Sequence, residues 1–442
     1  MVAVAIPDKA VGHGLMVQTT PNEIATSPLL GLLAMTVVCI DERLPPMTTA
    51  AHTASHRLDF LDNTLADLKS QNLYQSLETV DGPTGPEITM DGQRLINFAS
   101  NNYLNLATHP KLKQAAIAAI ERYGVGAGAV RTISGTLDIH QTLEQKLAEF
   151  KGVGGVLVFQ SGFSASQAAI TSLMEAGDAV ISDALNHACI IDGMRLLRDV
   201  DKVIYPHSDM AALEAALQKT RLARRRLVIT DGVFSMDGDL AKLPEIVALA
   251  EQYNAMVMVD DAHGSGVFGK DGRGTVDHFG LHGRVDINVG TMSKAFGAMG
   301  GYIASTAAMR ELLVNKARPF LFSTPHPPGV VASCMAALEV LQTEPERMTR
   351  LWENTRYFKG ALQDLGYSIT SDSPILPVIL GESEQAWAFS KALREAGIYT
   401  RAIVFPTVAK DKARVRLMMN ADHTRAQLDK AVSVFERLKA RV

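Results

Sequence analysis

The sequence is poor in cysteine and has little net charge. Its three cysteines, Cys39, Cys189 and Cys334, are odd in number and widely spaced among 442 residues. This pattern argues against a disulfide framework and shows no metal-ligand spacing, so we expect no metal site and a reducing cytoplasm as the compartment. The formal net charge of −4 gives no electrostatic footprint for nucleic acid or an anionic membrane, and neither is expected as a partner.

Long hydrophobic runs are also lacking. The apolar stretch from Leu29 to Ile40 is shorter than the roughly 18 residues that cross a bilayer. Its upstream flank lacks the basic start of a signal peptide, and no clear cleavage site follows it. We therefore predict that residues 1–55 form a poorly ordered extension.

What the chain does contain is an alternation of short apolar runs and helical patterns between residues 153 and 304. The runs are continuous in Val and Ile rather than alternating with polar residues, which is typical of strands covered on both faces. We therefore predict an α/β fold with a mostly parallel seven-stranded sheet. The predicted strands are GVLVF (155–159), AVISD (179–183), KVIYP (202–206), RLVITDG (226–232), AMVMVDD (255–261), DINVGT (286–291) and GYIAS (301–305).

The segments on either side complete the predicted domains. A helical pattern from His56 to Leu77 and a hairpin near residues 88–98 form an N-terminal segment, residues 56–100. A large domain follows over residues 101–330, and a smaller C-terminal α+β domain over residues 331–442. The elements predicted after residue 327 are a helical region at 330–365 interrupted near Pro345, strands at 375–380 and 413–419, and helices at 383–396 and 426–441.

A single lysine, Lys294, follows the predicted strand 286–291 and lies among glycines and small polar residues. A lysine crowded by small residues at the mouth of a sheet can lose its proton and attack an aldehyde, as a pyridoxal phosphate (PLP) site requires. A solvated loop lysine is the alternative. The motif from Gln160 to Ser164 suits a phosphate, because a strand that gives way to a helix there presents N–H groups to an anion. Alone it is a weak signal, since turns from strand to helix often contain Ser and Gly for their geometry.

A second strand ends in two carboxylates and a histidine, Asp260, Asp261 and His263. A carboxylate at this position can hold a pyridine nitrogen protonated, which makes the ring an electron sink. We assign this role to Asp260 and place His263 near the phenolic oxygen of the ring. A helix N-cap for Asp261 and a core position for His263 are the structural alternatives.

Two further motifs follow predicted strands. His187, in SDALNHAC, can lie flat on a cofactor ring or cap a helix. Ser235, in GVFSMDG, can bond the phenolic oxygen or a substrate carbonyl, or serve as a turn serine. Each motif alone leaves both readings open.

Together the motifs carry a resemblance. NNYLNL, GAVRTISGT, SDALNHACIIDG, VFSMDGD, VDDAHGSGVFG and GTMSKAFG resemble, in this order and spacing, the α-oxoamine synthases. The resemblance runs from about residue 56 to the C-terminus. It implies a PLP-dependent transferase of fold type I that condenses an amino acid with an acyl-CoA and forms a homodimer with shared active sites.

The resemblance also implies individual roles. Lys294, His187, Asp260 and His263 would be the catalytic residues, with Lys294 bound to the cofactor aldehyde. The residues implied to bind the cofactor are Ser161, Gly162, Phe163, His187, Ser235, Asp260, His263, Thr291 and Lys294, with Ser323 and Thr324 reaching the phosphate of the partner subunit. Asn101 and Arg416 would hold the substrate carboxylate.

Within the family, SDALNHACIIDG and ARPFLFST are most similar to the glycine C-acetyltransferases of threonine degradation, which join glycine and acetyl-CoA. The alternative is 8-amino-7-oxononanoate synthase of biotin biosynthesis, which joins alanine and a pimeloyl thioester with loss of the carboxylate. Dual activity is a further alternative, because a difference of one methyl is worth only ~1–3 kcal/mol. A non-catalytic PLP-binding protein is disfavoured, since mere binding needs no electron-sink carboxylate.

One position departs from the family pattern. Asn105 stands in NYLNL where relatives usually carry glycine, so we expect the turn to differ locally.

Overall fold

The computed structural model describes residues 57–71 and 73–439. The predicted extension, residues 1–55, lies outside the described residues. Residues 57–67 belong to a different unit from residues 68–439. Helix α1 (Phe60–Ser70) is shorter than the helix predicted from His56 to Leu77. Among the described residues, no helix combines the length and the apolar character needed to span a bilayer.

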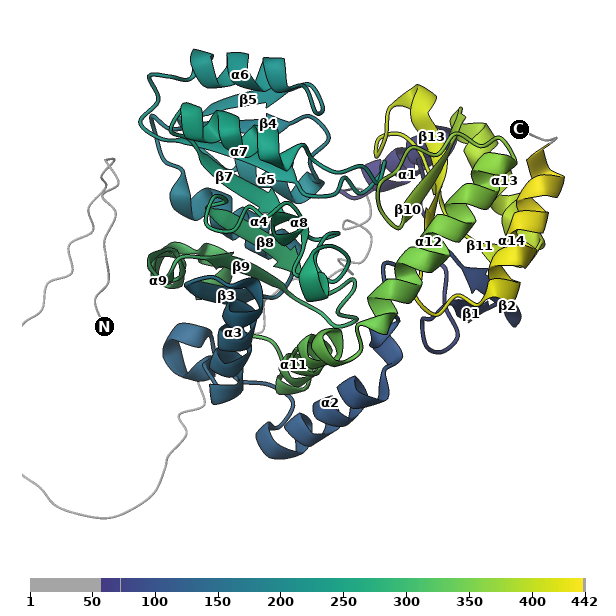
Figure 1. Cartoon of the computed structure of the whole chain (residues 1–442), viewed down its shortest axis with the longest axis horizontal. Coiled ribbons are helices and arrows are strands. Elements are labelled where there is room, and N and C mark those ends of the chain that lie inside the picture. Colours follow the sequence, from purple (N-terminus) through teal and green to yellow (C-terminus); the bar gives the residue numbers. More distant parts are fainter. Residues whose placement is uncertain (1–56, 72, 440–442) are drawn as a thin grey trace, which may run out of the picture. The chain divides into compact units, whose positions relative to one another are not determined.

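The large sheet contains seven strands in the order β3-β9-β8-β7-β6-β4-β5. Only β9 runs antiparallel to its neighbours, so the predicted α/β fold with a mostly parallel sheet is confirmed (Figure 1). Each predicted strand agrees with the observed one to within one residue at either end. The observed strands are β3 (Gly155–Phe159), β4 (Ala179–Asp183), β5 (Asp201–Tyr205), β6 (Arg226–Asp231), β7 (Met256–Asp260), β8 (Ile287–Thr291) and β9 (Gly301–Ser305).

Helices cover both faces of this sheet, as its continuous apolar runs require. On one face, strand residues such as Leu157 and Ile229 pack against α4 (Gly162–Leu173), α5 (Ala188–Arg195), α9 (Ala307–Lys316) and α10 (Arg318–Leu321). On the other face, the strands pack against α3 (Asp138–Lys151), α6 (Met210–Lys219), α7 (Leu243–Gln252) and α11 (Pro328–Thr343). Helix α2 (Pro110–Tyr123) packs on α11. The short helix α8 (Thr275–His278) follows β7.

The C-terminal elements build two small sheets. One has the order β10-β13-β12, from Ile375–Gly381, Ala413–Met418 and Ala402–Ile403. The other joins the hairpin β1 (Glu87–Met90) and β2 (Gln93–Asn97) to β11 (Ile398–Tyr399), which runs parallel to β2. The predicted N-terminal hairpin therefore forms a sheet with the C-terminal segment. The boundary at residue 330 stays a prediction.

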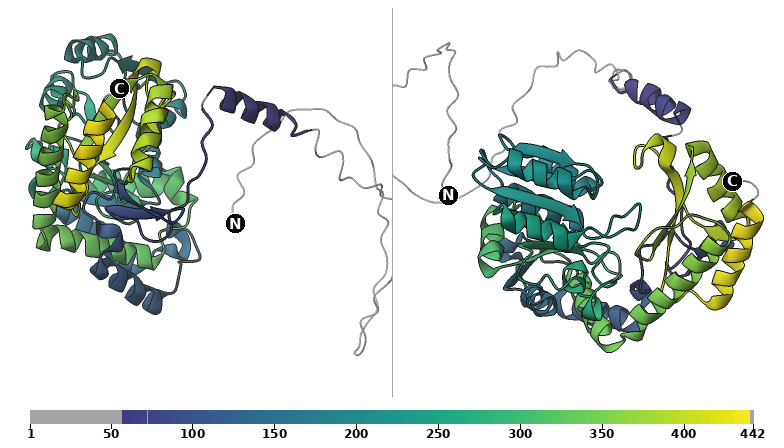
Figure 2. Two further views of the ribbon diagram at one scale, coloured as in Figure 1. Left: turned by 90° about the vertical axis from the view of Figure 1, so that its right-hand side faces the viewer. Right: turned by 45° about the horizontal axis from the view of Figure 1, so that its top comes forward.

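Three helices accompany these small sheets. Helix α12 (Glu346–Asp364) runs from the end of α11 to the C-terminal elements, where it packs on α14 (Arg425–Leu438) (Figure 1). Helix α13 (Ser383–Glu395) packs on β10, β12 and β13. Figure 2 shows the large sheet in teal and the C-terminal elements in yellow-green as two layered groups. Helix α12 contacts both groups: Trp352 Nε1 donates to Val267 O at 3.0 Å, after β7, and the Phe358 ring stacks on Phe98, after β2, at a centroid distance of 5.1 Å.

Asn105 occupies the left-handed region of backbone space, with φ 55° and ψ 36°. Glycine adopts this conformation freely, and Asn is among the few other residues that tolerate it. Its side-chain Nδ2 donates to Asp422 Oδ2 at 2.9 Å, and its Oδ1 accepts from Asn102 Nδ2 at 3.3 Å. The residue that departs from the family pattern thus keeps the backbone conformation of a glycine.

We expect Asn105→Ala to destabilise the protein by about 2 kcal/mol, because a β-carbon in the left-handed region and a lost hydrogen bond both cost stability. Asn105→Gly loses only the hydrogen bonds, so its destabilisation is expected to be about half as large. Thermal unfolding of both variants checks the order. Equal melting temperatures would show that backbone conformation does not constrain this position.

Candidate active site

A cavity of about 270 Å³ lies at the carboxyl ends of the parallel strands. Polar residues that end β6, β7 and β8 meet there because parallel strands present these ends at one edge of the sheet. The predicted site residues that line the cavity are Ser161, Gly162, Phe163, His187, Ser235, Asp260, His263, Thr291 and Lys294. Asn101, Arg416, Ser323 and Thr324 are not among its lining residues.

The start of α4 forms one wall of this cavity. Ser161 caps the helix by accepting a hydrogen bond from Ser164 N at 3.0 Å, and Gly162 begins it. A β-carbon on Gly162 would lie 3.2 Å from Thr291 Cβ, so a small residue is needed for this close approach. The free N–H groups and the positive end of the helix suit a phosphate, and the hydroxyl of Thr291 lies beside them. The predicted phosphate-binding residues therefore fit the phosphate of PLP.

The two carboxylates at the end of β7 point to different partners. Asp260 Oδ2 accepts from Ser166 Oγ at 3.0 Å and from Cys189 Sγ at 3.6 Å, and the residue lines the cavity. Asp261 is fully buried behind it and accepts from Thr275 Oγ1 at 2.7 Å in the first turn of α8. It also pairs with Lys151, at 3.4 Å, and accepts from Ser265 Oγ at 3.5 Å. Of the two, only Asp260 is available to a cofactor ring, whereas Asp261 holds α8 and α3 in place.

A third carboxyl group, Asp231, lines the same cavity and was not predicted as a site residue. It pairs directly with Asp260 in the register of β6 and β7. Burial and the negative charge of Asp260 raise the pKa of Asp231 well above its usual range. The negative charge of Asp260 thus disfavours ionisation of Asp231. Both residues end predicted strands, which is the sequence signal that could have found Asp231, whereas their pairing depends on which strands become neighbours.

His263 is a buried neutral donor. Burial is the main cause that holds the pKa of His263 well below its usual value, and the positive charges of Lys294 and Arg416 add to it. Its Nδ1 lies 2.7 Å from the hydroxyl of Tyr103, and burial raises the pKa of this hydroxyl. In the tautomer in which Tyr103 donates to Nδ1, the neutral ring carries its proton on Nε2. Tyr103, which holds the ring through this bond, was not predicted.

His187 caps a helix, as one interpretation of its motif predicts, and it also lines the cavity. Its Nδ1 accepts from Cys189 N at 3.2 Å and so caps α5, while its ring lines the cavity. Its backbone N donates to Asp231 Oδ1 at 3.3 Å. A capping bond at one nitrogen fixes the ring without covering its face, so the cap is compatible with stacking on a cofactor.

Lys294 lines the cavity in the loop after β8. Burial lowers the pKa of its ammonium group, although the charges of Asp260 and Asp231 oppose this effect. A lowered pKa increases the share of neutral amine, which is the form that attacks an aldehyde. This is the property that the sequence predicts for Lys294.

Arg416 lies on β13, beside the cavity. Its Nη1 donates to Ser235 O at 2.7 Å, and no carboxylate pairs with it among the described residues. Asn101 has a buried Oδ1 without a hydrogen-bond partner in the described part of the chain. An unpaired guanidinium and an orphaned amide oxygen are consistent with binding an amino-acid substrate, a role that stays a prediction for both residues.

Ser323 and Thr324 follow α10, away from the cavity. Thr324 O accepts a hydrogen bond from Gln160 Nε2, so this segment lies next to the start of α4 in the same chain. Their predicted contact with the phosphate of the partner subunit stays a prediction.

His207 forms a clamp of two hydrogen bonds that joins the motif SDALNHAC to the motif VFSMDGD. Its Nδ1 donates to Asp183 Oδ1 at 3.0 Å, after β4, and its Nε2 donates to Asp239 Oδ2 at 2.9 Å, close to Ser235. Burial opposes the charge on this ring, but the bonds to both carboxylates prevail and raise the pKa of His207 to about 10. The clamp fixes the loop that carries Ser235, and sequence reasoning missed it because its partners are distant in the chain.

Comparisons with known proteins agree with this site. The family model of class I and II aminotransferases matches residues 93–435. The 8-amino-7-oxononanoate synthase of Alkaliphilus metalliredigens is 54% identical over 385 residues, which make up 87% of this chain and 97% of that protein. The 8-amino-7-oxononanoate synthase 1 of Bacillus subtilis is 52% identical over 380 residues, 86% of this chain and 97% of that protein.

Solved structures show the same fold. The serine palmitoyltransferase of S. paucimobilis with a bound PLP–myriocin aldimine is 32% identical, with a TM-score of 0.82 over 87% of this chain and 98% of that one. The 8-amino-7-oxononanoate synthase of Francisella tularensis is 26% identical, with a TM-score of 0.68 over 78% of this chain and 98% of that one. The fold-type I architecture implied by the resemblance is thereby confirmed.

We expect His207→Gln to lower stability by about 1–2 kcal/mol at pH 6, where the parent histidine is fully charged in the folded state. A pKa raised from 6.5 to about 10 stabilises the fold below about pH 6.5, and this stabilisation is lost as the pH rises towards 10. The difference in melting temperature between parent and variant should therefore shrink from pH 6 to pH 10.

The control is His282→Gln, at an exposed histidine with one carboxylate partner, Asp277. Its effect on the melting temperature should be small at every pH. A difference for His207→Gln that stays constant across the pH range would contradict the charged clamp.

Proposed function

Since the chain belongs to the class I and II aminotransferase family and, within it, to the α-oxoamine synthases, we propose that it acts as an 8-amino-7-oxononanoate synthase. The reaction would join alanine to a pimeloyl thioester, release the thiol and lose the alanine carboxylate as carbon dioxide. The observation that carries this proposal is sequence identity of 51–54% to relatives of that name over nearly their whole length.

The chain is a PLP-dependent acyltransferase. When bound, PLP supplies an aldehyde and an electron-withdrawing ring that stabilises negative charge on the α-carbon of the amino acid. We propose that Ser161, Gly162, Phe163 and Thr291 hold its phosphate, which fits the cavity wall at the start of α4. Lys294 would hold the aldehyde.

The acidic residues beneath the ring have complementary tasks. Asp260, held by Ser166 and Cys189, would keep the pyridine nitrogen protonated. Burial and the charge of Asp260 raise the pKa of Asp231, which disfavours a second negative charge at this place. His187 would cover the ring face, and the Nε2 proton of His263 and the hydroxyl of Ser235 would point to the phenolic oxygen.

Lys294 also suits the proton transfer. Its neutral Nζ would take the proton from the α-carbon of the amino-acid substrate. Burial favours the neutral amine, because it lowers the pKa of the ammonium group. Arg416 and Asn101 would orient the substrate carboxylate.

The glycine C-acetyltransferase reading of the sequence, with its place in threonine degradation, is not supported and is replaced here. Identity of 52–54% over 87% of this chain favours the synthase instead. The homodimer with shared sites and the cytoplasmic location remain parts of the proposal.

A substrate matrix tests the proposal. Glycine, alanine and serine are each combined with acetyl-, pimeloyl- and palmitoyl-CoA, and the release of free thiol is followed. Alanine with pimeloyl-CoA should give the highest kcat/KM, and glycine with acetyl-CoA should be lower by at least tenfold. If glycine with acetyl-CoA is the best pair, the synthase assignment is wrong and the family assignment stands.

Lys294→Ala should remove the visible absorbance of the protein-bound cofactor and reduce turnover to background, because no other amine lines the cavity among the described residues. Absorbance spectra after dialysis check this. Lys146→Ala, at an exposed position on α3, is the control and should keep both band and activity. A band that survives in Lys294→Ala would mean that another amine holds the aldehyde.

A further inference from the structure

A second cavity, of about 390 Å³, adjoins the site at Arg416. Arg416 lines it and donates to the carbonyl oxygen of Ser235, which lines the cavity of Lys294. The second cavity is therefore next to the reacting groups. Its volume lies within the range of about 300–1,000 Å³ that is usual for small-molecule sites.

The lining of this second cavity combines an apolar wall with polar groups that contribute about as much of its surface. Leu73, Ile403, Val404 and Phe405 give it hydrocarbon walls, and they come from the segment before β1 and from β12 and the loop after it. Walls of this kind suit a chain of methylene groups, which gains free energy when it leaves water. An acyl chain is the part of the proposed substrates with this chemistry.

The charged groups of this cavity are positive, and its other polar side chains, Gln75 and Thr407, are neutral. Arg401 and Arg416 both line it, and no carboxylate does among the described residues. With Arg416 assigned to the carboxylate of the amino acid, Arg401 is left for a second anion. An acetyl or palmitoyl chain has no such group, whereas a dicarboxylic acyl chain carries one at its far end.

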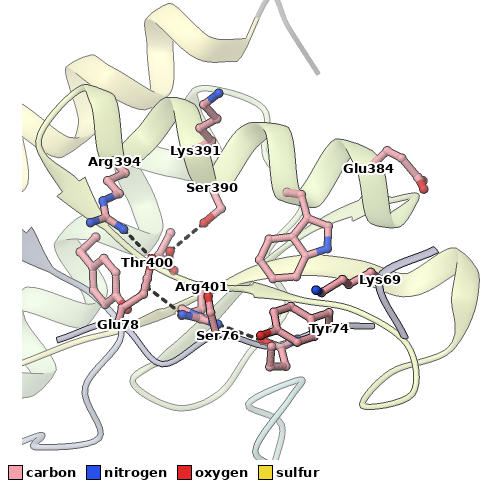
Figure 3. Close-up of a pocket in the computed structure, with 13 residues that line it drawn as sticks. Lys69, Tyr74, Ser76, Glu78, Glu384, Ser390, Lys391, Arg394, Thr400 and Arg401 are labelled. Atoms are coloured by element: carbon pink, nitrogen blue, oxygen red, sulfur yellow. Dashed lines mark hydrogen bonds and ion pairs between the residues drawn. The ribbon is translucent and has the colours of Figure 1, made fainter. Parts of the chain in front are cut away.

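Arg401 and Gln75 also line a further pocket of about 640 Å³, so the two pockets meet at these residues. Figure 3 shows Arg401 among the residues of this further pocket. Its Nη1 donates to Glu78 Oε2 at 2.8 Å and its Nη2 to Gln75 Oε1 at 2.9 Å. Glu78 also binds Arg394, at 2.5 Å, so one carboxylate serves two guanidinium groups. Arg394 has a second carboxylate partner, Asp91, at 2.8 Å. Arg401 is thus held in place at the cavity by Glu78 and Gln75.

From these observations we propose that the second cavity takes the acyl chain of a dicarboxylic acyl thioester and that Arg401 binds the terminal carboxylate. The inference rests on the proposed function and adds the residue that selects the acyl donor. A planar guanidinium can bind a carboxylate through two hydrogen bonds, which gives selectivity for a charged chain end over a methyl group.

The test compares two acyl donors with seven acyl carbons, pimeloyl-CoA and heptanoyl-CoA, with alanine as the amino acid. Heptanoyl-CoA lacks only the terminal carboxylate. The parent enzyme should prefer pimeloyl-CoA through a lower KM. Arg401→Gln should raise the KM for pimeloyl-CoA by about tenfold or more, with little change in kcat and in the kinetics of heptanoyl-CoA. Arg401→Lys, which keeps the charge, should retain part of the preference.

Arg394→Gln is the matched control. Arg394 shares Glu78 with Arg401 but lines only the outer pocket, so its loss should leave the ratio of the two donors unchanged. A uniform loss with both donors in Arg401→Gln, or an unchanged preference, would overturn the inference and leave the proposed function intact. If the parent enzyme fails to use pimeloyl-CoA with alanine, the proposed function fails and the inference fails with it.

Discussion

The arrangement of the site depends on the burial of Asp260 at the end of a central strand. A buried carboxylate is costly unless donors surround it, and here the donors come from the two helices that cover the adjacent face of the sheet. Ser166 belongs to α4 and Cys189 to α5. The same two helices begin at the cavity, with Ser161 and His187 as their N-caps. Packing of α4 and α5 against the sheet therefore fixes the start of α4, His187 and Asp260 relative to one another.

The loop with Ser235 shows how the small sheet contributes. On one side, His207 binds Asp239 and connects the loop to the end of β4. On the other side, β13 provides two arginines: Arg414 donates to Asp237 Oδ1 at 2.6 Å, and Arg416 donates to Ser235 O. Charged hydrogen bonds of this kind are stronger than neutral ones. The large sheet and the C-terminal elements thus hold the same five-residue loop from two directions, and Arg416 comes to the cavity as a result.

Much of this could be read from local sequence. Continuous Val and Ile runs predict buried parallel strands, and polar residues at their ends predict a common site, because both signals lie within a few residues. The roles of Asp231, Tyr103 and His207 could not be read in this way. Asp231 matters through its register with Asp260, and Tyr103 through a bond to a residue 160 positions away. Such roles depend on which strands and loops become neighbours, which single motifs do not specify.

The substrate was misjudged for a related reason. The motif SDALNHACIIDG contributes His187 and Cys189 to the cavity of Lys294 and no residue to the second cavity, so it carries little information on the acyl donor. Selectivity for the acyl chain must come from groups that only the chain reaches. Here these groups are the apolar residues of the loop after β12 and Arg401, which is positioned through Glu78 and Gln75 from the segment before β1. Both segments lie outside the motifs. The residues that identify the chemistry are therefore different from those that select the substrate, and a resemblance carried by the first set could establish the family without establishing the acyl donor.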